Sequence, residues 1–255
     1  MSKKYNYWFE VDNGQATLIK YTGEEYHVKL PSSVYGVPVT KLGEYEVLNL
    51  SGAAKRGIFE DSNVSEVSIP EGVTEICNDA FYSSGLCEVN IPSSVRVVGT
   101  RAFAFCKYLR SVEFETGIKT ISESMFSNCK NLRFIELPSS VEKIEGDAFA
   151  ECALQKIDLP ENINTIESYA FRECDSLTFV TIPPKVTSIN SGTFFSCDFL
   201  EKVNIHDEVK YIANDAFDRC DKLTICGIKG SYAEQYANEH NIPFEELDAT
   251  IEFPN

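Results

Sequence analysis

Hydrophobic and polar positions repeat along most of this chain in a phrase of 22 to 23 residues, which is clearest at residues 132–152. In each phrase two apolar residues flank one polar residue, the period of a short half-buried strand. A second apolar pair, three residues apart, follows, and a phenylalanine comes near the end. This phenylalanine returns at Phe59, Phe81, Phe103, Phe126, Phe149, Phe171, Phe194 and Phe217. So short and regular a period predicts a solenoid, one unit stacked on copies of itself around a continuous core.

Each coil is predicted to contain two extended segments and one turn. A proline usually ends the first segment, because proline cannot continue a strand in the middle of a sheet. Glu115 and His206 replace this proline in two coils, where we expect the strand to run on slightly. The repeated phenylalanine lies in a predicted turn or single helical turn, with Asp79, Asp147 and Asp215 placed to cap it.

The N-terminal end departs from the repeat, as expected because a bare first coil would expose its core and an unpaired strand edge. Residues 1–62 are predicted to form a cap and a first irregular repeat, with a β-hairpin that turns at Asn13 and Gly14. An insertion at residues 44–58 is predicted to elaborate this cap by packing on the first coil, and a binding role is the alternative.

Residues 63–220 hold seven regular repeats, and residues 221–255 are predicted to form a C-terminal cap. Within this cap, Ser231 can act as the N-cap of a short helix over residues 231–240. Alanine and tyrosine recur there four residues apart, which places them on one face of that helix.

The charge balance restricts the partners. The formal net charge is -16 at pH 7, which excludes nucleic acid because phosphate binding needs clustered lysine and arginine. A basic or neutral protein partner fits better, although the charge also keeps an elongated monomer in solution. No uncharged apolar run approaches the ~20 residues that cross a bilayer. The first ten residues have two lysines and no apolar segment behind them, so we expect no secretory signal here.

Nine cysteines are present, and six of them lie three residues after the repeated phenylalanine. These six are Cys106, Cys129, Cys152, Cys174, Cys197 and Cys220. Neighbouring coils lie ~5 Å apart, a spacing that permits disulfides, but we predict a buried column of thiols that pack as small apolar side chains. Cys77 and Cys87 occupy positions that are polar in other repeats and are candidate reactive thiols, whereas Cys226 is placed in a core column.

The residues predict no metal site, no cofactor and no enzyme. The chain has no Cys-x-x-Cys pair and three histidines, so the ligand spacing of a structural zinc site is missing. His206, Asp207 and Glu208 could attract a metal ion, but a surface turn is the favoured interpretation. Glycine-rich phosphate loops and the GxSxG and HExxH motifs are also missing.

Two columns of outward side chains are predicted on the sheet face, because parallel strands repeat their side chains about every 4.8 Å. One column runs Ser68, Asn90, Glu113, Glu136, Asp158, Thr181 and Asn204. The column two residues earlier runs Glu66, Glu88, Ser111, Phe134, Lys156, Phe179 and Lys202. The acidic residues form a solvated ladder in this interpretation, in preference to a glycosidase pair.

The candidate binding site combines the acidic centre of the first column with the apolar and basic part of the second. Its residues are Phe134, Lys156, Phe179, Lys202, Glu113, Glu136 and Asp158. Phe134 and Phe179, about 10 Å apart with Lys156 between them, are candidate aromatic anchors. In the alternative, both rings fold onto the strand ends and are half-buried.

The repeated phrase, roughly L-x-x-I-x-I-P-x-x-V-x-x-I-x-x-x-A-F-x-x-C, resembles the BspA-like branch of the leucine-rich repeat family, also called the Treponema pallidum type. Seven consecutive coils from Val64 to Cys220 match it, with Ser84 in place of cysteine in the first. The resemblance implies an α/β repeat solenoid: a right-handed leucine-rich repeat superhelix with a parallel β-sheet on one face, short second strands or turns opposite, and a cap at each end.

The same resemblance implies a non-catalytic, protein-binding function through the sheet face, in adhesion or in contact with host or neighbouring cells. Two alternatives stay open. An intracellular scaffold or regulator suits the nine cysteines, and a carbohydrate-binding solenoid would use Phe134 and Phe179 to stack on sugar rings. The compartment also stays open, since the family analogy favours secretion or the cell surface and the cysteine content suits the cytoplasm.

Overall fold

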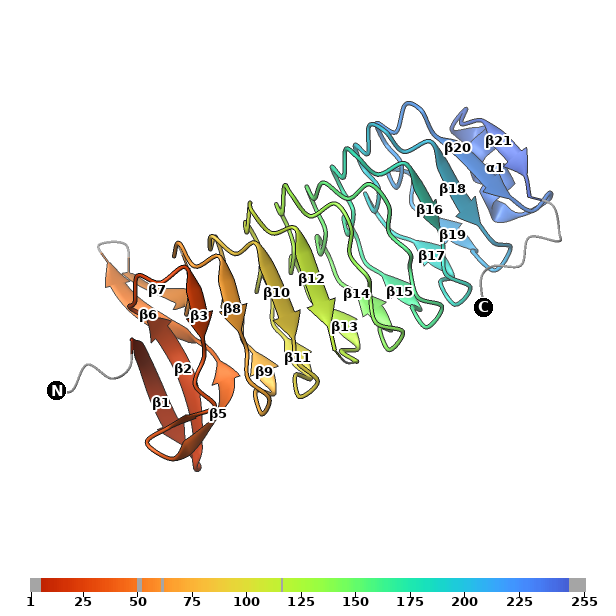
Figure 1. Ribbon diagram of the computed structural model, residues 1–255. Helices are drawn as coiled ribbons and strands as arrows, with labels where there is room; N and C mark the ends of the chain where they lie inside the picture. Colours follow the sequence, from red (N-terminus) through yellow and green to blue (C-terminus); the bar gives the residue numbers. More distant parts are fainter. Residues whose placement is uncertain (1–5, 50–51, 61, 116, 248–255) are drawn as a thin grey trace.

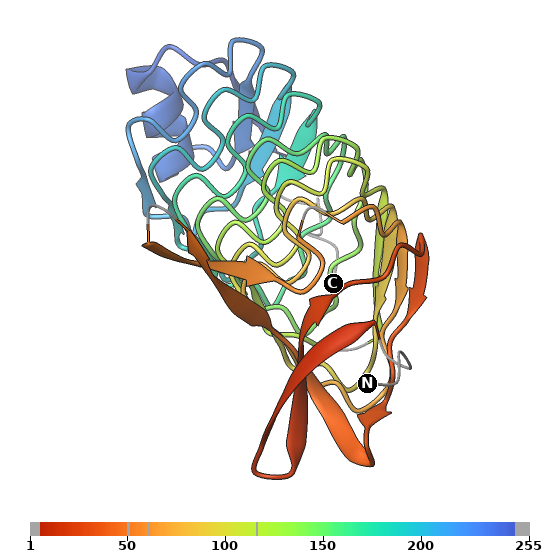
Figure 2. The same ribbon diagram turned by 90° about the vertical axis from the view of Figure 1, so that its left-hand side faces the viewer.

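The chain winds into a β-solenoid, an elongated stack of coils whose strands run parallel from coil to coil (Figure 1). The structure, a computed structural model, describes residues 6–49, 52–60, 62–115 and 117–247. Seen from the N-terminal end, the coils follow one another along a common axis (Figure 2). The repeating coils consist of strands and turns, and the helical part of the expected α/β class is confined, among the described residues, to α1 (Tyr232–Glu239).

The longer strands form one face of the solenoid, here called the open face. They are β3 (His27–Lys29), β8 (Glu66–Ser68), β10 (Glu88–Ile91), β12 (Ser111–Phe114), β16 (Phe179–Thr181), β18 (Lys202–Ile205), β20 (Thr224–Gly227) and β21 (Phe244–Glu246). Adjacent strands pair in parallel with the register that the repeat predicts, so that Val67, Val89 and Val112 lie side by side in the core.

The second extended segment of each coil is a strand of two residues on the other side of the core. These strands are β9 (Glu75–Ile76), β11 (Val97–Val98), β13 (Thr120–Ile121), β14 (Lys143–Ile144), β15 (Thr165–Ile166), β17 (Ser188–Ile189) and β19 (Tyr211–Ile212). Where they pair, they also pair in parallel. The predicted second short segment is therefore confirmed.

The N-terminal hairpin forms as predicted from β1 (Tyr7–Asp12) and β2 (Gln15–Tyr21). Asn13 and Gly14 turn it with φ angles of 49° and 75°, the left-handed region that these residue types tolerate best. β2 pairs in parallel with β5 (Val37–Leu42), which pairs with β9. The hairpin is thus joined to the sheet of short strands.

Two further antiparallel pairs occur near this end. β4 (Ser33–Val34) pairs with the beginning of β5. The insertion predicted at residues 44–58 contains a hairpin of β6 (Glu44–Asn49) and β7 (Gly52–Gly57). At the C-terminal end, the side chain of Ser231 accepts the amide of Glu234 at the start of α1, so the predicted N-cap is confirmed.

A stack of phenylalanine rings organises the core. From Phe59 to Phe217 each ring lies on the next, with centroids between 5.0 and 5.6 Å apart and planes inclined by no more than 14°. Tyr21 packs on Phe59 at 5.4 Å, and Tyr236 of α1 meets Phe217 edge-on at 6.1 Å. The stacked and the edge-on arrangements are both favourable for aromatic pairs. The sequence predicted the phenylalanine column but not the tyrosines at its ends.

The segment that carries each phenylalanine is a turn, which confirms one of the two predicted alternatives. The other, a single helical turn capped at Asp79, Asp147 and Asp215, does not form. The residues on either side of the phenylalanine adopt left-handed backbone angles, such as 54° at Asp147 and 59° at Glu151. A right-handed helix needs negative φ at these positions. The Asp147 carboxylate accepts a hydrogen bond from Nε of Arg172 in the next coil at 2.6 Å and caps no helix.

Alternate amides of this turn bond to the next coil. The amides of Asp147, Phe149 and Glu151 donate to carbonyls of the following turn at 3.4, 2.8 and 2.8 Å. Equivalent bonds recur at the other phenylalanines, from Phe59 to Phe194. The left-handed residues make this possible, because they turn successive peptide groups toward neighbouring coils. The ring stack and this hydrogen-bond ladder therefore join the coils along the same edge of the solenoid.

The six cysteines that follow the phenylalanine are all buried, as predicted. They do more than pack, because each thiol donates a hydrogen bond to the carbonyl of the phenylalanine in the preceding coil, at 3.0 to 3.2 Å. The thiol is a weak donor, but in these six coils it adds a bond between neighbouring coils to a carbonyl that also accepts a main-chain amide. Burial raises the pKa of Cys106 to about 11 and holds the pKa values of Cys129 and Cys174 well above their usual range.

Cys226 is buried, but its predicted place in a core column is wrong. It lies beside Asn204 of β18 and Glu245 of β21, in the polar column of the open face. Burial there comes from β21, an added strand that the repeat does not contain. Cys77 and Cys87 are half-buried, in agreement with their polar positions in the repeat.

The two coils without proline also differ from expectation. β12 and β18 end before Glu115 and His206, and they are no longer than β10, whose coil keeps its proline. His206 is buried, with Nε2 2.9 Å from the carbonyl oxygen of Pro183 and Nδ1 accepting the amide of Glu208 at 3.2 Å. Both ring nitrogens are engaged, which argues against a metal site there.

We expect a thiol reagent to modify at most Cys77 and Cys87 in the native protein and all nine cysteines after denaturation. The reason is that the thiolate must be reached by the reagent to react, and the other seven thiols are buried. Intact-mass spectrometry counts the adducts and peptide mapping places them. Rapid native labelling of four or more thiols of the buried column would contradict the register described above.

Cys152 offers a second test. Cys152→Lys should lower the free energy of unfolding by roughly 3 kcal/mol or more, because it buries an unpaired charge. Cys152→Ser is the matched control and should cost less than about 1.5 kcal/mol, since Ser84 fills the equivalent place in an earlier coil. Chemical denaturation measures both, and equal stability of the two variants would show that the column is not buried.

Candidate functional site

The open face presents the two predicted columns of side chains to solvent, and each member is exposed or half-buried. Lys156 bridges in parallel to Phe179, and Glu136 to Asp158. Phe134, two residues before Glu136, therefore lies beside Lys156 and in line with Phe179. This is the order that the sequence predicted.

The two candidate anchors differ in exposure. Phe134 is 60% exposed, whereas Phe179 is 36% exposed. The alternative in which both rings fold onto the strand ends is thus wrong for Phe134, and Phe179 is partly covered. The two rings offer a partner unequal contact areas, with the larger at Phe134.

The main-chain ladder of the open face is interrupted once among the described residues, between β12 and residues 133–137. In the other coils, the residue that follows the first core leucine of the repeat donates its backbone amide to a backbone carbonyl of the preceding coil. The amides of Arg110 and Gln155, for example, donate to Cys87 and Arg133 at 2.8 and 3.0 Å. The amide of Arg133 makes no equivalent bond within the described part of the chain. One coil boundary of the open face is therefore held by packing without a ladder.

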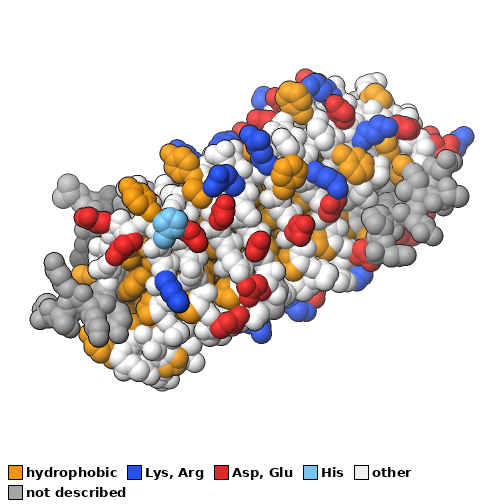
Figure 3. Space-filling view, viewed as in Figure 1, with side chains coloured by type: hydrophobic (Ala, Val, Ile, Leu, Met, Phe, Trp, Pro, Cys, Tyr) orange, Lys and Arg blue, Asp and Glu red, His pale blue; other side chains and the backbone are white. Residues whose placement is uncertain are grey.

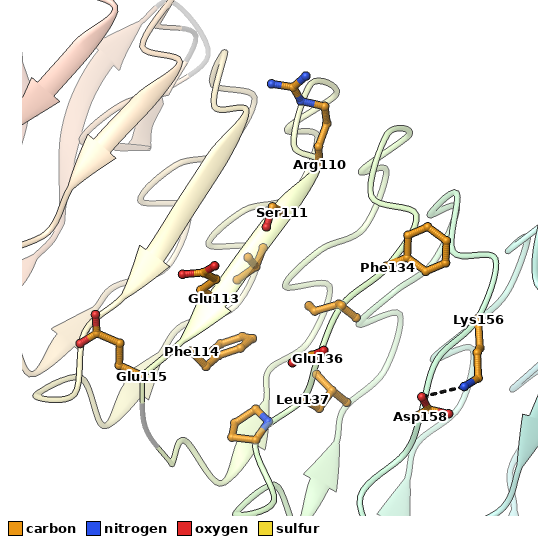
Figure 4. A pocket seen from close by; sticks show the side chains of 13 residues that line it. Arg110, Ser111, Glu113, Phe114, Glu115, Phe134, Glu136, Leu137, Lys156 and Asp158 are labelled. Atoms are coloured by element: carbon orange, nitrogen blue, oxygen red, sulfur yellow. Dashed lines mark hydrogen bonds and ion pairs between the residues drawn. The ribbon is translucent and has the colours of Figure 1, made fainter.

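A groove of ≈ 850 Å³ opens at this boundary (Figure 4). Its lining changes along the strands: Arg110, Phe134 and Lys156 lie where the strands begin, Glu113, Glu136 and Asp158 lie in the middle, and Phe114, Leu137 and Pro138 lie where they end. Phe114 and Leu137 are half-buried, as are Ile69 and Leu159 at the same repeat position, whereas Ile91, Ile182 and Ile205 are buried. The groove thus contains apolar side chains that are only partly covered.

The carboxylates of the open face differ in whether they are paired. A row of acidic side chains crosses this face (Figure 3). Glu88 and Asp158 form ion pairs with Arg110 and Lys156 at 3.5 and 2.9 Å, and Glu66 is hydrogen-bonded to Nδ1 of His27 at 2.6 Å. Glu113 and Glu136 have no ion pair and no side-chain hydrogen bond within the described residues. The two unpaired carboxylates occupy the middle of the groove.

The structure brings five of the seven predicted site residues together and leaves two outside. The groove is lined by Glu113, Phe134, Glu136, Lys156 and Asp158. Phe179 lies at its margin beside Lys156. Lys202 is farther along the sheet, where its ammonium group is 2.6 Å from the carboxylate of Glu245, so it is engaged by the chain itself.

Sequence reasoning missed several further lining residues, among them Arg110, Phe114, Leu137 and Pro138. The one signal for them was a departure from the repeat at a single coil. Phe114 stands where other coils have isoleucine or leucine, and Glu115 stands where most have proline. A bulkier strand end followed by a missing proline marks the coil at which the open face separates.

No set of three or more His, Cys, Asp or Glu side chains in the described part of the chain is arranged to hold a metal ion. Likewise, no helix among these residues is long and apolar enough to cross a membrane. The groove itself is lined by charged, polar and apolar side chains.

A family model described as the BspA type leucine-rich repeat region, in six copies, matches residues 53–149 and 102–224. The chain belongs to the BspA-type leucine-rich repeat family. This membership confirms the resemblance drawn from the repeated phrase. No curated protein matches the chain significantly.

Solved structures extend the likeness over nearly the whole of this BspA-type chain. It is similar to a leucine-rich repeat protein from Bacteroides ovatus, with a TM-score of 0.64 and 21% identity over 97% of this chain and 76% of that one. It is also similar to a leucine-rich cell surface protein from Faecalibacterium prausnitzii, with a TM-score of 0.49 and 23% identity over 98% and 95%. The T. pallidum leucine-rich repeat protein gives 0.44 and 21% over 96% and 97%. The first of these supports the solenoid fold.

We expect Phe134→Ala to change the free energy of unfolding by less than about 0.5 kcal/mol, because the ring is exposed. Phe126→Ala, which removes a buried ring from the stack, should cost about 3–5 kcal/mol. Urea denaturation followed by circular dichroism measures both. A large loss of stability in Phe134→Ala would mean that this ring is a packing residue and not a surface anchor.

Proposed function

We propose that this BspA-type protein is a non-catalytic protein-binding module whose binding site is the groove at the break in the open face. The observation that carries the proposal is the exposed ring of Phe134, which lies at the edge of a groove lined by half-buried apolar residues and unpaired carboxylates. Protein-binding hot spots characteristically combine an aromatic anchor with surrounding polar groups. The groove thus provides both an anchor and a means of selecting the partner.

The partner is proposed to be a protein with a basic or neutral contact surface. The net charge of -16 and the carboxylates of the groove repel an acidic surface and attract a basic one. Family membership favours adhesion or contact with a host or neighbouring cell, and an intracellular scaffold is the alternative. Recovery of the native protein from culture medium or intact cells supports the first, and recovery confined to the cell interior supports the second.

The proposal includes a right-handed solenoid with a cap at each end. Parallel strands joined by crossovers are right-handed in nearly all proteins. Tyr21 of the N-terminal hairpin covers Phe59, and Tyr236 of α1 covers Phe217. These contacts support a capping role, because they continue the ring stack into elements that do not repeat. The open face is then the surface that remains for a partner.

The double substitution Phe134→Ala with Phe179→Ala should weaken binding to a protein partner about tenfold or more, as expected for loss of aromatic anchors. The wild-type protein, immobilised, is first tested for saturable binding to host matrix proteins and to proteins of co-resident bacteria. Phe199→Ala is the matched control, because Phe199 is 50% exposed and lies outside the groove. It should bind like the wild type.

Unchanged binding by the double variant would place the site elsewhere on the molecule. Failure to find any saturable protein ligand, together with glycan-array hits that disappear in the double variant, would replace the protein partner by a carbohydrate. Aromatic rings on the open face could then stack on sugar rings. The two outcomes use the same proteins and separate the two candidate functions.

A further inference from the structure

We infer that the middle of the groove receives a single lysine or arginine side chain of the partner, whose charged group lies between the carboxylates of Glu113 and Glu136. The inference rests on the proposed function and specifies the chemistry by which that site recognises its partner. The partner segment should also carry an apolar residue beside the basic one. The observations below support each part.

Glu113 and Glu136 occupy the same outward position on successive coils. The two coils are not paired at this boundary, and like charges on the two sides of a groove repel each other. Neither carboxylate has an ion pair or a side-chain hydrogen bond within the described residues. On the next coil, Asp158 is neutralised by Lys156 at 2.9 Å (Figure 4). A cation placed between Glu113 and Glu136 would remove the repulsion that the free protein carries. A basic side chain is thus favoured both by attraction and by relief of repulsion.

The walls of the groove fit the rest of such a side chain. Lysine and arginine carry long apolar stems that pack along apolar surface while the charged group stays in a polar setting. Phe114 and Leu137, which are half-buried, provide apolar surface next to the carboxylates. At the other end of the groove, beside Arg110 and Lys156, the exposed ring of Phe134 provides apolar contact area.

The difference between the two ends of the groove restricts the partner further. Arg110 and Lys156 lie at the end where the strands begin, so a second basic residue of the partner would be repelled there. Phe114, Leu137 and Pro138 lie at the opposite end and favour an apolar residue. The amide of Arg133, without a main-chain partner in the described part of the chain, can donate to a carbonyl of the bound segment. One basic residue next to one apolar residue is therefore the pattern that matches this groove.

The probes for a direct test are three blocked heptapeptides, Gly-Ser-Ser-Xaa-Leu-Ser-Gly, in which Xaa is lysine, arginine or glutamine. NMR titration of the full-length protein should show the lysine and arginine peptides shifting the amides of residues 111–115 and 133–137. The glutamine peptide should bind at least about tenfold more weakly, because it lacks the charge. Binding of the basic peptides should also weaken as salt is added.

Glu113→Gln with Glu136→Gln should lower the affinity for the lysine peptide at least about tenfold, the cost of losing a close charge pair. Glu66→Gln with Glu71→Gln is the matched control, because it removes the same charge from the same face outside the groove. The control should keep nearly the wild-type affinity. Both variants replace exposed residues, so both should fold.

Three results would overturn the inference. The lysine and glutamine peptides could bind equally well, or the two double variants could lose the same affinity for the lysine peptide. The third is that neither basic peptide binds at about 10 mM, a concentration at which even weak specific recognition is detected. Each of these results leaves the proposed function intact if Phe134→Ala with Phe179→Ala still weakens the binding of a protein partner. If this double variant also binds the partner like the wild type, the proposed function is wrong as well.

Discussion

The stacking of one phenylalanine ring per coil is the constraint on which the rest of this structure depends. Rings 5.0 to 5.6 Å apart leave little freedom in the spacing of the coils along that edge. The same edge carries the amide ladder of the turns and the thiol bonds from each cysteine to the phenylalanine carbonyl of the preceding coil. Because ring, amide and thiol all join neighbouring coils at one edge, the far side of each coil can vary without loss of the stack.

Neighbouring coils vary most at the boundaries where their strands do not pair. The short strands separate between β11 and β13 and between β15 and β17. There the side chains of Ser122 and Asn190 donate to the carbonyls of Val98 and Ile166 at 2.5 and 2.6 Å. At the break in the open face, no side chain of the described residues replaces the missing main-chain bond of Arg133. Water can satisfy an exposed amide at small net cost, and the result is a groove instead of a repaired sheet.

The sequence predicted the features that follow from periodicity and missed those that depend on a single coil. The register of the strands, the cysteine column and the outward columns all follow from the repeat. The backbone angles of the turns do not, because residues such as Asp147 and Glu151 adopt left-handed angles that are uncommon for residues other than glycine. Cys226 was misplaced because β20 keeps the register of the repeat, which puts Cys226 opposite Asn204 in the polar column. The candidate site was predicted as a surface, but its groove depends on a local separation that Phe114 and Glu115 signal only weakly.

Hydrogen exchange of backbone amides in the native protein tests most directly the claim that the coils are locked along the phenylalanine edge and separated at one point of the open face. The amides of Phe126, Phe149 and Phe171 should exchange among the slowest, because each donates to the next coil beneath a buried ring. The amide of Arg133 should exchange much faster than the equivalent amides of Arg110, Gln155 and Thr178, which are bonded to the preceding coil. Equal protection of all four would show that the open face is continuous, and would contradict the groove on which the proposed binding site depends.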